Sequence, residues 1–275
     1  MTSRYFHHQL VDLHYYRFGS GPKAMLCFHG YGMHGRQFRV LESQLGESYT
    51  FYGFDLFFHN QTKLRHPSLA HIKDPIDIPA FLELMEAFCM HESIERFSVI
   101  AYSMGTHYAS VLTTLMASRI DDVFMLAPSF LRVFFLLDLL AKNKTANLIF
   151  YRLFMSARVM KTALFIGKKL LLIADKDYQV LCKEMAEPSM RYAFYGNVTY
   201  SRHLDVRKDV FTKALNLHHV RCHFIFGERD RVYHAKIADQ LMANLTHATK
   251  TILDEDHDMV NENLPAKIYQ LLYDH

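Results

Sequence analysis

Short apolar runs recur along the chain, and each ends at a glycine, a proline or a polar residue. Such runs are typical of strands buried on both faces of a parallel sheet. The sequence predicts strands of this kind at residues 24–28, 51–54, 97–101, 123–127, 222–226 and 251–253. Alternating apolar positions before the turn sequence Gly19-Ser20-Gly21-Pro22 predict two further short strands near the beginning of the chain.

Stretches with helical periodicity separate these runs. Residues 78–91 carry apolar side chains three to four positions apart, and Pro265 is a typical first-turn residue of a helix. Helices are predicted at residues 78–91, 105–118, 233–245 and 265–273. Strands that alternate with helices form βαβ units with right-handed crossovers. We therefore expect an α/β fold with a mostly parallel central sheet and helices on both faces.

The alternation stops at residues 129–209, where the pattern contains helix-like stretches and no strand bounded by turns. Roughly 80 residues between two neighbouring strands far exceed the usual connection length. We therefore expect an α/β core at residues 1–128 and 210–275 and an inserted helical cap at residues 129–209.

Composition narrows the class of protein. A hydrophobic content of 50% and a charged content of 21% exclude extensive disorder. The net charge of +3 is too small to argue for a nucleic-acid partner. The 4 cysteines lack CxxC spacing, and 4 cysteines in a chain of 275 residues do not form a disulfide scaffold. Since no signal-like or membrane-spanning apolar stretch is visible, we expect a soluble, cytoplasmic protein.

A serine lies between a predicted strand and a predicted helix, in Ala101-Tyr102-Ser103-Met104-Gly105. A nucleophile elbow is a sharp strand-to-helix turn that needs small residues two positions before and after its serine. Ala101 and Gly105 meet this requirement. Taken alone, the segment fits equally well an ordinary turn with Ser103 as the helix N-cap.

A glycine-rich loop, His29-Gly30-Tyr31-Gly32, follows the first buried run. Acyl transfer needs backbone N–H donors directed at the developing oxyanion. This loop provides one candidate donor, and the residue after the nucleophile, Met104, provides the second. A plain glycine turn at a strand end remains the alternative.

An acid and a histidine follow the last two predicted strands. Asp230 ends the segment Gly227-Glu228-Arg229-Asp230, and His257 lies in a loop before the final helix. An acid at a strand end orients a histidine, and we prefer Asp230 to Glu228 for this role. An acidic helix start and a solvated acidic loop remain the alternatives.

These features occur in the order oxyanion loop, serine, acid, histidine, each at the carboxyl end of a predicted strand, where sites of open α/β sheets form. Together they resemble the motifs of the α/β-hydrolase superfamily, in its cap-bearing type. The resemblance includes the HGxG loop at His29, a Gly-Phe-Asp strand end at Asp55, the GxxD acid at Asp230, and the spacing from His257 to Glu262 and Pro265. Asp256 stands where the family usually has glycine.

The resemblance implies a serine hydrolase that cleaves a small-to-medium carboxylic ester with an apolar moiety through an acyl-enzyme. Ser103 would be the nucleophile, His257 the general base and Asp230 its orienting acid. The N–H groups of Tyr31 and Met104 would form the oxyanion hole. Supporting roles in the loops would fall to His29, Gly30, Gly32 and Gly105.

Other readings remain open for the same residues. The superfamily also contains C–C bond hydrolases, thioesterases and enzymes of other reactions, such as amidases, lyases and cofactor-free peroxidases. A non-catalytic ligand-binding member would keep the same fold. An aspartate at the nucleophile position would have implied a dehalogenase or an epoxide hydrolase, and Ser103 argues against both.

No metal or nucleotide motif stands out, since HExxH, GxGxxG and Cys/His clusters are missing from the sequence. We expect no metal, no cofactor and no nucleic-acid partner, but a small apolar ester-like substrate. The apolar and basic cap offers contact with acyl chains or a membrane surface, although a solvated cap face is the favoured interpretation. The sequence leaves the oligomeric state open.

Overall fold

The computed structural model describes residues 1–132, 135–170 and 175–273. The chain forms two compact units, each assembled from segments that are separated in sequence. The first unit comprises Met1–His66, Asp77–Arg132 and Leu204–His275, and the second comprises Pro67–Ile76 and Val133–His203.

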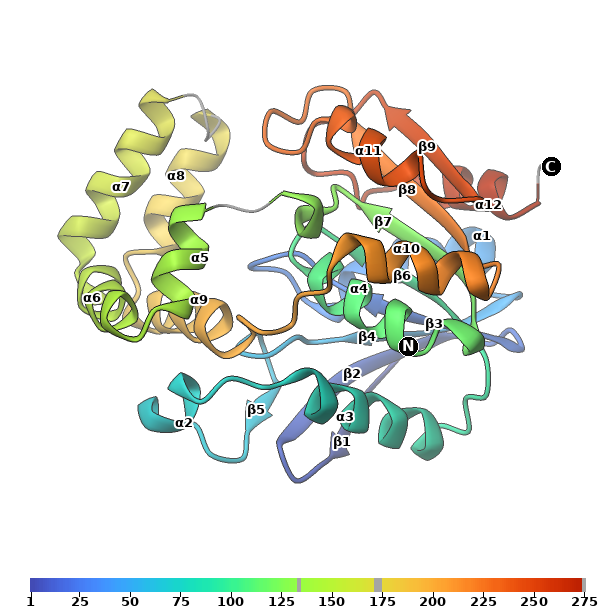
Figure 1. Cartoon of the computed structure of the whole chain (residues 1–275), viewed down its shortest axis with the longest axis horizontal. Coiled ribbons are helices and arrows are strands. Elements are labelled where there is room, and N and C mark those ends of the chain that lie inside the picture. Colours follow the sequence, from blue (N-terminus) through green and yellow to red (C-terminus); the bar gives the residue numbers. More distant parts are fainter. Residues whose placement is uncertain (133–134, 171–174, 274–275) are drawn as a thin grey trace. The chain divides into compact units, whose positions relative to one another are not determined.

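A nine-stranded sheet forms the centre of the first unit, in the order β1-β2-β4-β3-β6-β7-β8-β9, with β5 paired to β2 (Figure 1). The two N-terminal strands and β5 pair antiparallel, while β4, β3, β6, β7, β8 and β9 run parallel. The strands are β1 Thr2–His7, β2 Val11–Gly19, β3 Lys23–Phe28, β4 Tyr49–Phe54, β5 Lys63–Leu64, β6 Phe97–Tyr102, β7 Ile120–Leu126, β8 Arg221–Gly227 and β9 Ala248–Leu253. The predicted mostly parallel α/β sheet is confirmed.

Helices cover both faces of this sheet (Figure 1). On one face α4 packs against α3 and α10, and on the other Leu45 of α1 and Ile268 of α12 share a core with strand residues such as Ile100. Every residue of β4 and β6 is consequently buried, which explains their uninterrupted apolar runs. The helical segments are η1 Gly35–Leu41, α1 Glu42–Leu45, α3 Ile78–His91, α4 Gly105–Leu115, η2 Ala117–Arg119, η3 Ser129–Leu131, α10 Lys208–Leu217, η4 Ala235–Ala238, α11 Asp239–Met242 and α12 Leu264–Tyr273.

The helix predicted at residues 233–245 is wrong in extent, because only the short segments η4 and α11 form there. The Asp230 carboxylate accepts hydrogen bonds from the N–H groups of Val232 and Tyr233. These bonds hold the chain in a turn before the helical segment begins. The apolar periodicity of this stretch gave no sign of that turn.

Helices are the regular secondary structure of the second unit, within its described residues. Its helices are α2 Leu69–Lys73, α5 Phe135–Lys142, α6 Lys144–Met155, α7 Ala157–Lys169, α8 Asp175–Glu184 and α9 Pro188–Tyr200. Asn143 and Ser156 cap α6 and α7, since each side chain accepts a first-turn N–H. Inside the unit, the buried Asn147 amide accepts a hydrogen bond from the Tyr195 hydroxyl at 2.7 Å, which ties α6 to α9.

The segment Pro67–Ile76 is held to the rest of the second unit by backbone carbonyls. Tyr192 donates its hydroxyl hydrogen to the carbonyl of Pro67 at 3.1 Å, and Arg202 donates to that of Lys73 at 2.7 Å. The N–H of Ile76 donates to the carbonyl of Tyr200 at 3.0 Å. The second unit therefore consists of two chain segments. The predicted division of the chain into a core and a cap at residues 129–209 stays a prediction.

Candidate active site

Ser103 occupies the turn between β6 and α4 in a left-handed backbone conformation, with φ of 49°. Such a conformation costs about 1–3 kcal/mol for a non-glycine residue and persists only where its surroundings enforce it. Here the N–H of Ser103 donates to the Leu126 carbonyl at 2.8 Å. Its own carbonyl accepts from the hydroxyls of Thr106 and Ser129 at 2.6 and 2.8 Å. The turn is therefore held by hydrogen bonds on both sides of the serine.

Close backbone packing explains why small residues surround this turn. A Cβ at Gly105 would lie 2.2 Å from the Phe28 carbonyl oxygen, and a Cβ at Gly30 would lie 2.7 Å from the Tyr102 ring. Ala101 is fully buried in the sheet. The small residues on both sides of Ser103 thus meet a steric requirement of the turn.

His257 bridges Ser103 and Asp230, which come from distant parts of the chain. Its Nδ1 lies 2.7 Å from Asp230 Oδ2, and its Nε2 lies 3.2 Å from Ser103 Oγ. A carboxylate only accepts, so Nδ1 carries the hydrogen. Nε2 is then free to accept the proton of the Ser103 hydroxyl, as a general base requires.

Asp230 is nearly inaccessible to solvent but fully hydrogen-bonded. Its Oδ1 accepts from the N–H groups of Val232 and Tyr233 at 2.8 and 3.0 Å. Burial alone would raise the pKa of Asp230, but the hydrogen bond and charge of His257 and these two N–H groups lower it below its usual value. The carboxyl group therefore stays ionised beside the imidazole.

Two tyrosines that the sequence analysis missed fix the His257 loop. The Tyr102 hydroxyl donates to the His257 carbonyl at 2.7 Å, and the imidazole lies 5.3 Å from the Tyr102 ring and 5.4 Å from the Tyr233 ring. Burial and the nearby Asp230 raise the pKa of Tyr233 to about 12, so its phenol stays neutral. Tyr102 occupies a variable position of the serine motif and Tyr233 lies three residues after Asp230, so neither position gave a signal for this role.

The loop around Gly227 also fits the histidine loop closely. A Cβ at Gly227 would lie 2.3 Å from the carbonyl oxygen of Asp256. Glycine at the end of β8 therefore lets the segment that carries His257 approach the segment that carries Asp230.

The glycine-rich loop lies next to the serine turn. A Cβ at Gly30 would be 3.5 Å from the Ser103 Cβ, and Gly32 has φ of 73°, which favours glycine. Met104 is the N-cap of α4, and the first N–H groups of a helix lack intrahelical partners. The oxyanion-hole role of Tyr31 and Met104 stays a prediction.

His29 is fully buried, and its ring forms hydrogen bonds with backbone groups of two chain segments. Its Nε2 accepts the Leu56 N–H at 3.0 Å, and its Nδ1 donates to the Gly30 carbonyl at 2.6 Å. Burial, with a smaller contribution from the nearby His59, holds the pKa of His29 well below its usual value. The neutral ring thus links β3 to the chain after β4.

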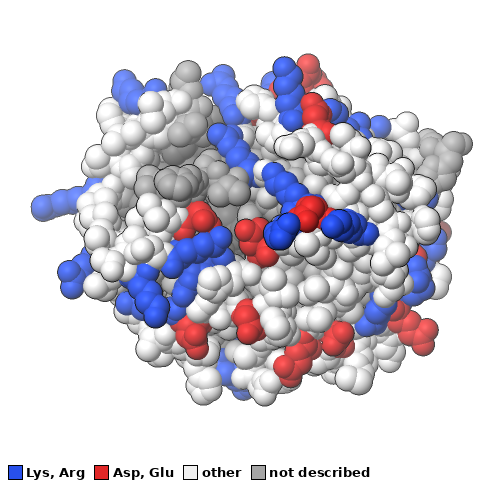
Figure 2. Space-filling view, in the orientation of Figure 1, with Lys and Arg blue, Asp and Glu red and all other residues white. Residues whose placement is uncertain are grey.

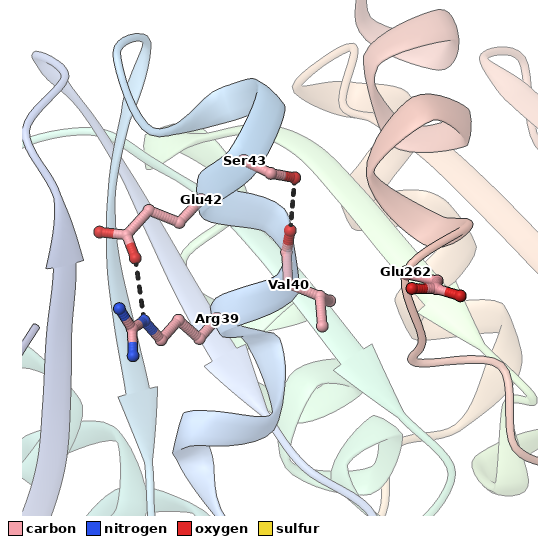
Figure 3. Close-up of a pocket in the computed structure, with 5 residues that line it drawn as sticks. All are labelled: Arg39, Val40, Glu42, Ser43 and Glu262. Carbon is pink, nitrogen blue, oxygen red and sulfur yellow. Dashed lines mark hydrogen bonds and ion pairs between the residues drawn. The ribbon is translucent and has the colours of Figure 1, made fainter.

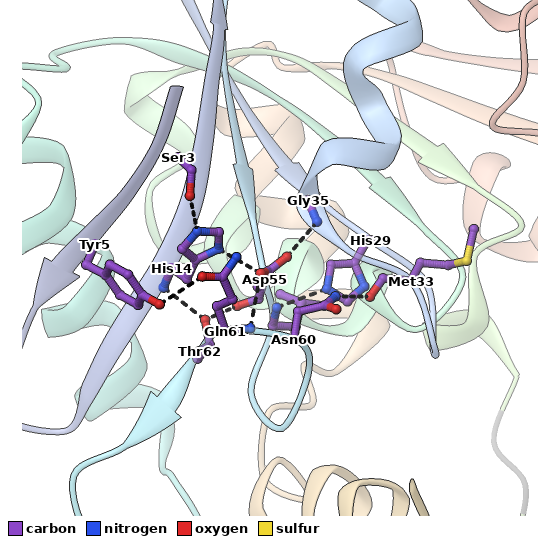
Figure 4. Close-up of polar contacts among 11 residues, drawn as sticks. Ser3, Tyr5, His14, His29, Met33, Gly35, Asp55, Asn60, Gln61 and Thr62 are labelled. Carbon is purple, nitrogen blue, oxygen red and sulfur yellow. Dashed lines mark hydrogen bonds and ion pairs between the residues drawn. The ribbon is translucent and has the colours of Figure 1, made fainter. Parts of the chain in front are cut away.

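A second polar cluster surrounds the fully buried Asp55 (Figure 4). Its carboxylate accepts from the Gly35 N–H at 3.0 Å, the Gln61 N–H at 3.3 Å and His14 Nδ1 at 2.7 Å. On its other side His14 Nε2 lies 2.7 Å from Ser3 Oγ. We call these five residues the Asp55 network. The Asp55 of the Gly-Phe-Asp motif therefore supports β1, β2 and β4 and lies outside the Ser103 cluster.

A surface pocket of the first unit lies elsewhere (Figure 3) and is lined by Arg39, Val40, Glu42, Ser43 and Glu262. Arg39 pairs with Glu42 at 3.1 Å, and Ser43 donates to the Val40 carbonyl at 2.9 Å. None of the predicted catalytic residues lines it. Within the described residues, no group of three or more His, Cys, Asp or Glu side chains is arranged to hold a metal ion.

The fold and this cluster define an α/β protein with a serine, a histidine and an aspartate at the carboxyl ends of its strands. Residues 25–271 match the model of the alpha/beta hydrolase family, and the chain belongs to that family. No functionally curated protein matches it.

Solved structures share the fold at low sequence identity. A provisionally assigned epoxide hydrolase from Pseudomonas aeruginosa is 16% identical with a TM-score of 0.62, covering 100% of this chain and 96% of that chain. The thioesterase domain from the curacin biosynthetic pathway is 13% identical with a TM-score of 0.66, covering 99% of each chain. A structure from work on carboxylesterases of the thaumarchaeon Nitrososphaera gargenis is 15% identical with a TM-score of 0.64, covering 98% of this chain and 96% of that chain. These similarities establish a common fold.

Proposed function

We propose that this protein is a serine hydrolase that cleaves a carboxylic ester with an apolar moiety, with Ser103, His257 and Asp230 as its catalytic triad. One observation carries the proposal. His257 bonds Asp230 through Nδ1 at 2.7 Å and faces Ser103 Oγ through Nε2 at 3.2 Å, while Ser103 stands on a strained strand-to-helix turn. A nucleophile, its base and the group that orients the base are thus in reach of one another.

In the first half-reaction, Ser103 Oγ attacks the ester carbonyl carbon and its proton passes to His257 Nε2. The tetrahedral oxyanion accepts hydrogen bonds from the N–H groups of Tyr31 and Met104. As the carbon–oxygen bond to the leaving group breaks, His257 returns the proton to the departing alkoxide. Asp230, ionised and held by two N–H groups, stabilises the imidazolium that exists between these transfers.

In the second half-reaction, water takes the place of the alcohol. His257 accepts a proton from that water, whose oxygen attacks the acyl carbon of the acyl-enzyme. Collapse of the second tetrahedral intermediate releases the carboxylic acid, and the proton returns to Ser103 Oγ. The same residues serve both halves, and the cycle needs no metal or cofactor.

We infer the apolar character of the substrate from the general composition of ligand sites, which are mostly apolar with a few polar groups. A serine nucleophile favours acyl chemistry over the epoxide opening named for the Pseudomonas aeruginosa structure, for which the family resemblance implies an aspartate at this position.

A fluorophosphonate probe tests the proposal directly, because it reacts with an activated serine. We expect labelling of the wild-type chain at Ser103, located by peptide mass spectrometry, and loss of labelling in Ser103→Ala. A panel of p-nitrophenyl esters of increasing acyl length then reports the preferred chain length. An unlabelled Ser103 in the folded wild-type protein, together with no ester turnover, would falsify the proposal.

A further inference from the structure

Exposed apolar side chains gather on two neighbouring helices of the second unit, α6 and α7, and on the residue after α7. Seven large apolar side chains there are between 39% and 64% exposed, namely Leu148, Ile149, Leu153, Val159, Phe165, Ile166 and Leu170. Single exposed apolar residues are ordinary, but a concentration of them marks an interaction surface.

On α6 the exposed residues form one side of the helix. Leu148, Ile149 and Leu153 lie there with the basic residues Lys144 and Arg152, because positions three to four apart share a helix face. The buried residues of α6 are Asn147 and Phe150. The helix thus contributes one face to the interior of its unit and presents a second apolar face to solvent.

On α7 the same division is present. Met160 and Leu164 are its buried residues, while Val159 and Ile166 are exposed and seven positions apart, two turns along one side. Arg158 and Lys161 are exposed as well. The apolar residues of α7 therefore stand beside basic ones.

The charge within residues 139–170 has a single sign, and one of its basic residues, Lys142, pairs with Asp138 just before this segment at 2.7 Å. Residues 139–170 contain no Asp or Glu, and their seven basic residues are Lys142, Lys144, Arg152, Arg158, Lys161, Lys168 and Lys169. The whole chain has a net charge of only +3, so positive charge is concentrated here. Figure 2 shows Lys and Arg side chains projecting at the edge where Figure 1 draws α6 and α7.

We propose that this surface, the α6–α7 face, docks onto a phospholipid bilayer that carries anionic headgroups. Its members are the seven exposed apolar side chains together with Lys144, Arg152, Arg158, Lys161 and Lys169. Apolar side chains gain free energy when they enter the boundary between headgroups and acyl chains. Each Lys or Arg near an anionic surface adds about 1 kcal/mol of attraction.

The positive charge and the apolar side chains of the α6–α7 face together favour an anionic bilayer over a second copy of the chain or a nucleic acid. A second copy of the chain would bring two positive faces together, which opposes self-association through this surface. Nucleic acid would satisfy the basic residues but leave the aliphatic ones in contact with phosphates. No described helix is long and apolar enough to span a membrane.

Sedimentation of the full chain with phospholipid vesicles tests the inference without any substrate. We expect the protein to pellet with vesicles that mix phosphatidylserine into phosphatidylcholine, to pellet far less with phosphatidylcholine alone, and to be released as salt rises. Absence of pelleting with the anionic vesicles at low salt overturns the proposal, as does equal pelleting with both kinds of vesicle.

Matched variants assign the binding to this face. Arg158→Glu with Lys161→Glu should weaken binding to the anionic vesicles by about tenfold or more, since two attractive charges become repulsive. Lys23→Glu with Lys63→Glu alters net charge equally at exposed positions of the first unit and should leave binding unchanged. Ile149→Ser with Ile166→Ser should weaken binding, whereas Leu217→Ser, at a 73% exposed position of α10, should not. Equal effects of test and control variants contradict the assignment.

The docking does not depend on the proposed hydrolase activity, and the two are separable. Ser103→Ala should pellet like the wild type, and the α6–α7 variants should keep wild-type turnover of a short, water-soluble ester. Thermal unfolding of each variant verifies that it is folded. Specific binding to DNA, or a concentration-dependent dimer, without vesicle binding would replace the bilayer as the partner and overturn the proposal.

Discussion

The first unit contains two hydrogen-bonded chains of the same three residue types. In one, Ser103 faces His257, which bonds Asp230. In the other, Ser3 faces His14, which bonds Asp55. The histidine-to-carboxylate distance is 2.7 Å in both, so this distance alone does not distinguish a catalytic arrangement from a structural one.

The backbones that carry the two serines differ. Ser3 lies in the regular antiparallel pairing of β1 with β2, opposite Tyr16, with no helix following it. Ser103 stands on a left-handed turn at the N-terminal end of α4. The turn lifts the hydroxyl away from the strand and brings helix N–H groups near it, which an edge strand does not do.

The histidines differ as well. His14 is fully buried, whereas the side chain of His257 is 40% exposed. A general base must exchange protons with substrate and water, and a sealed imidazole does not. We interpret the Asp55 network as a structural support and the Ser103 cluster as the reactive one, and the following predictions test that distinction.

Replacement of the two serines should give the largest difference. Ser103→Ala removes the proposed nucleophile and should lower kcat for a p-nitrophenyl ester by about 10⁴–10⁶-fold. Ser3→Ala should leave kcat within about twofold, because that hydroxyl is not the nucleophile. Steady-state kinetics of both purified variants measure the two kcat values. Comparable losses in the two variants would make the distinction untenable.

Replacement of the two aspartates should separate activity from stability. Asp230→Asn presents an amide to His257 and disturbs its tautomer, which should lower kcat by about 10⁴-fold. Asp55→Asn instead leaves buried donors facing an amide. Each donor that loses its acceptor should reduce the free energy of unfolding by about 1–3 kcal/mol. Urea titration and kinetics of each variant provide both readouts. A catalytic collapse in Asp55→Asn with unchanged stability contradicts this assignment.

Mild acid should destabilise the loops around the two clusters through His29. Its pKa in the folded chain lies well below the ordinary value of 6.5, so below that pH the unfolded chain binds more protons. The free energy of unfolding should therefore fall on acidification below pH 6.5, by up to about 1.4 kcal/mol per pH unit for this group. Urea titrations between neutral pH and pH about 5 measure the slope.

His29→Gln serves as the control for this dependence of the free energy of unfolding on pH. In the variant, the difference in bound protons between the unfolded and folded chains should be smaller by close to one. Asp230 affects the free energy of unfolding at lower pH than His29 does. Since its folded pKa is lowered, its stabilising contribution is present above its ordinary value of 3.8 and is lost as the pH falls through the folded pKa. An unchanged slope in His29→Gln would show that other groups cause the acid sensitivity.

The smallest effect is expected from Tyr102→Phe. The variant loses the hydrogen bond to the His257 carbonyl and should lose about 1 kcal/mol of stability, with kcat/KM reduced by a few-fold. Since the hydroxyl does not touch the imidazole nitrogens, the pH–rate profile should keep its shape. A shifted profile would instead indicate that Tyr102 takes part in proton transfer.

The sequence predicts those parts of the molecule that depend on local sterics. The apolar runs locate the parallel strands because strands buried on both faces consist almost entirely of apolar residues. Gly105 marks the serine turn because a side chain there would meet the backbone of Phe28 and His29, and Ala101 is fully buried beside it in the sheet. The positions of Asp230 and His257 after successive strands follow from the parallel order of the sheet.

Features that arise where distant segments meet leave no local pattern. The contacts of Tyr102 and Tyr233 with His257 depend on three separate strand ends. The helix predicted at residues 233–245 is reduced to the two short segments η4 and α11, and the local periodicity does not show where they begin and end. The link between His14 and Asp55 likewise requires the pairing of β2 with β4, and the motif that marks Asp55 gives no sign of His14.

The two-segment construction of the second unit has a consequence for its evolution and for protein engineering. Ser103, Asp230 and His257 all belong to the first unit, so recombination could exchange the helical part without altering the reactive groups. Yet the carbonyls of Pro67 and Lys73 are bonded by Tyr192 and Arg202. A chimaera that transplants residues 133–203 alone would lose both hydrogen bonds. A graft that keeps them must therefore include residues 67–76 together with residues 133–203.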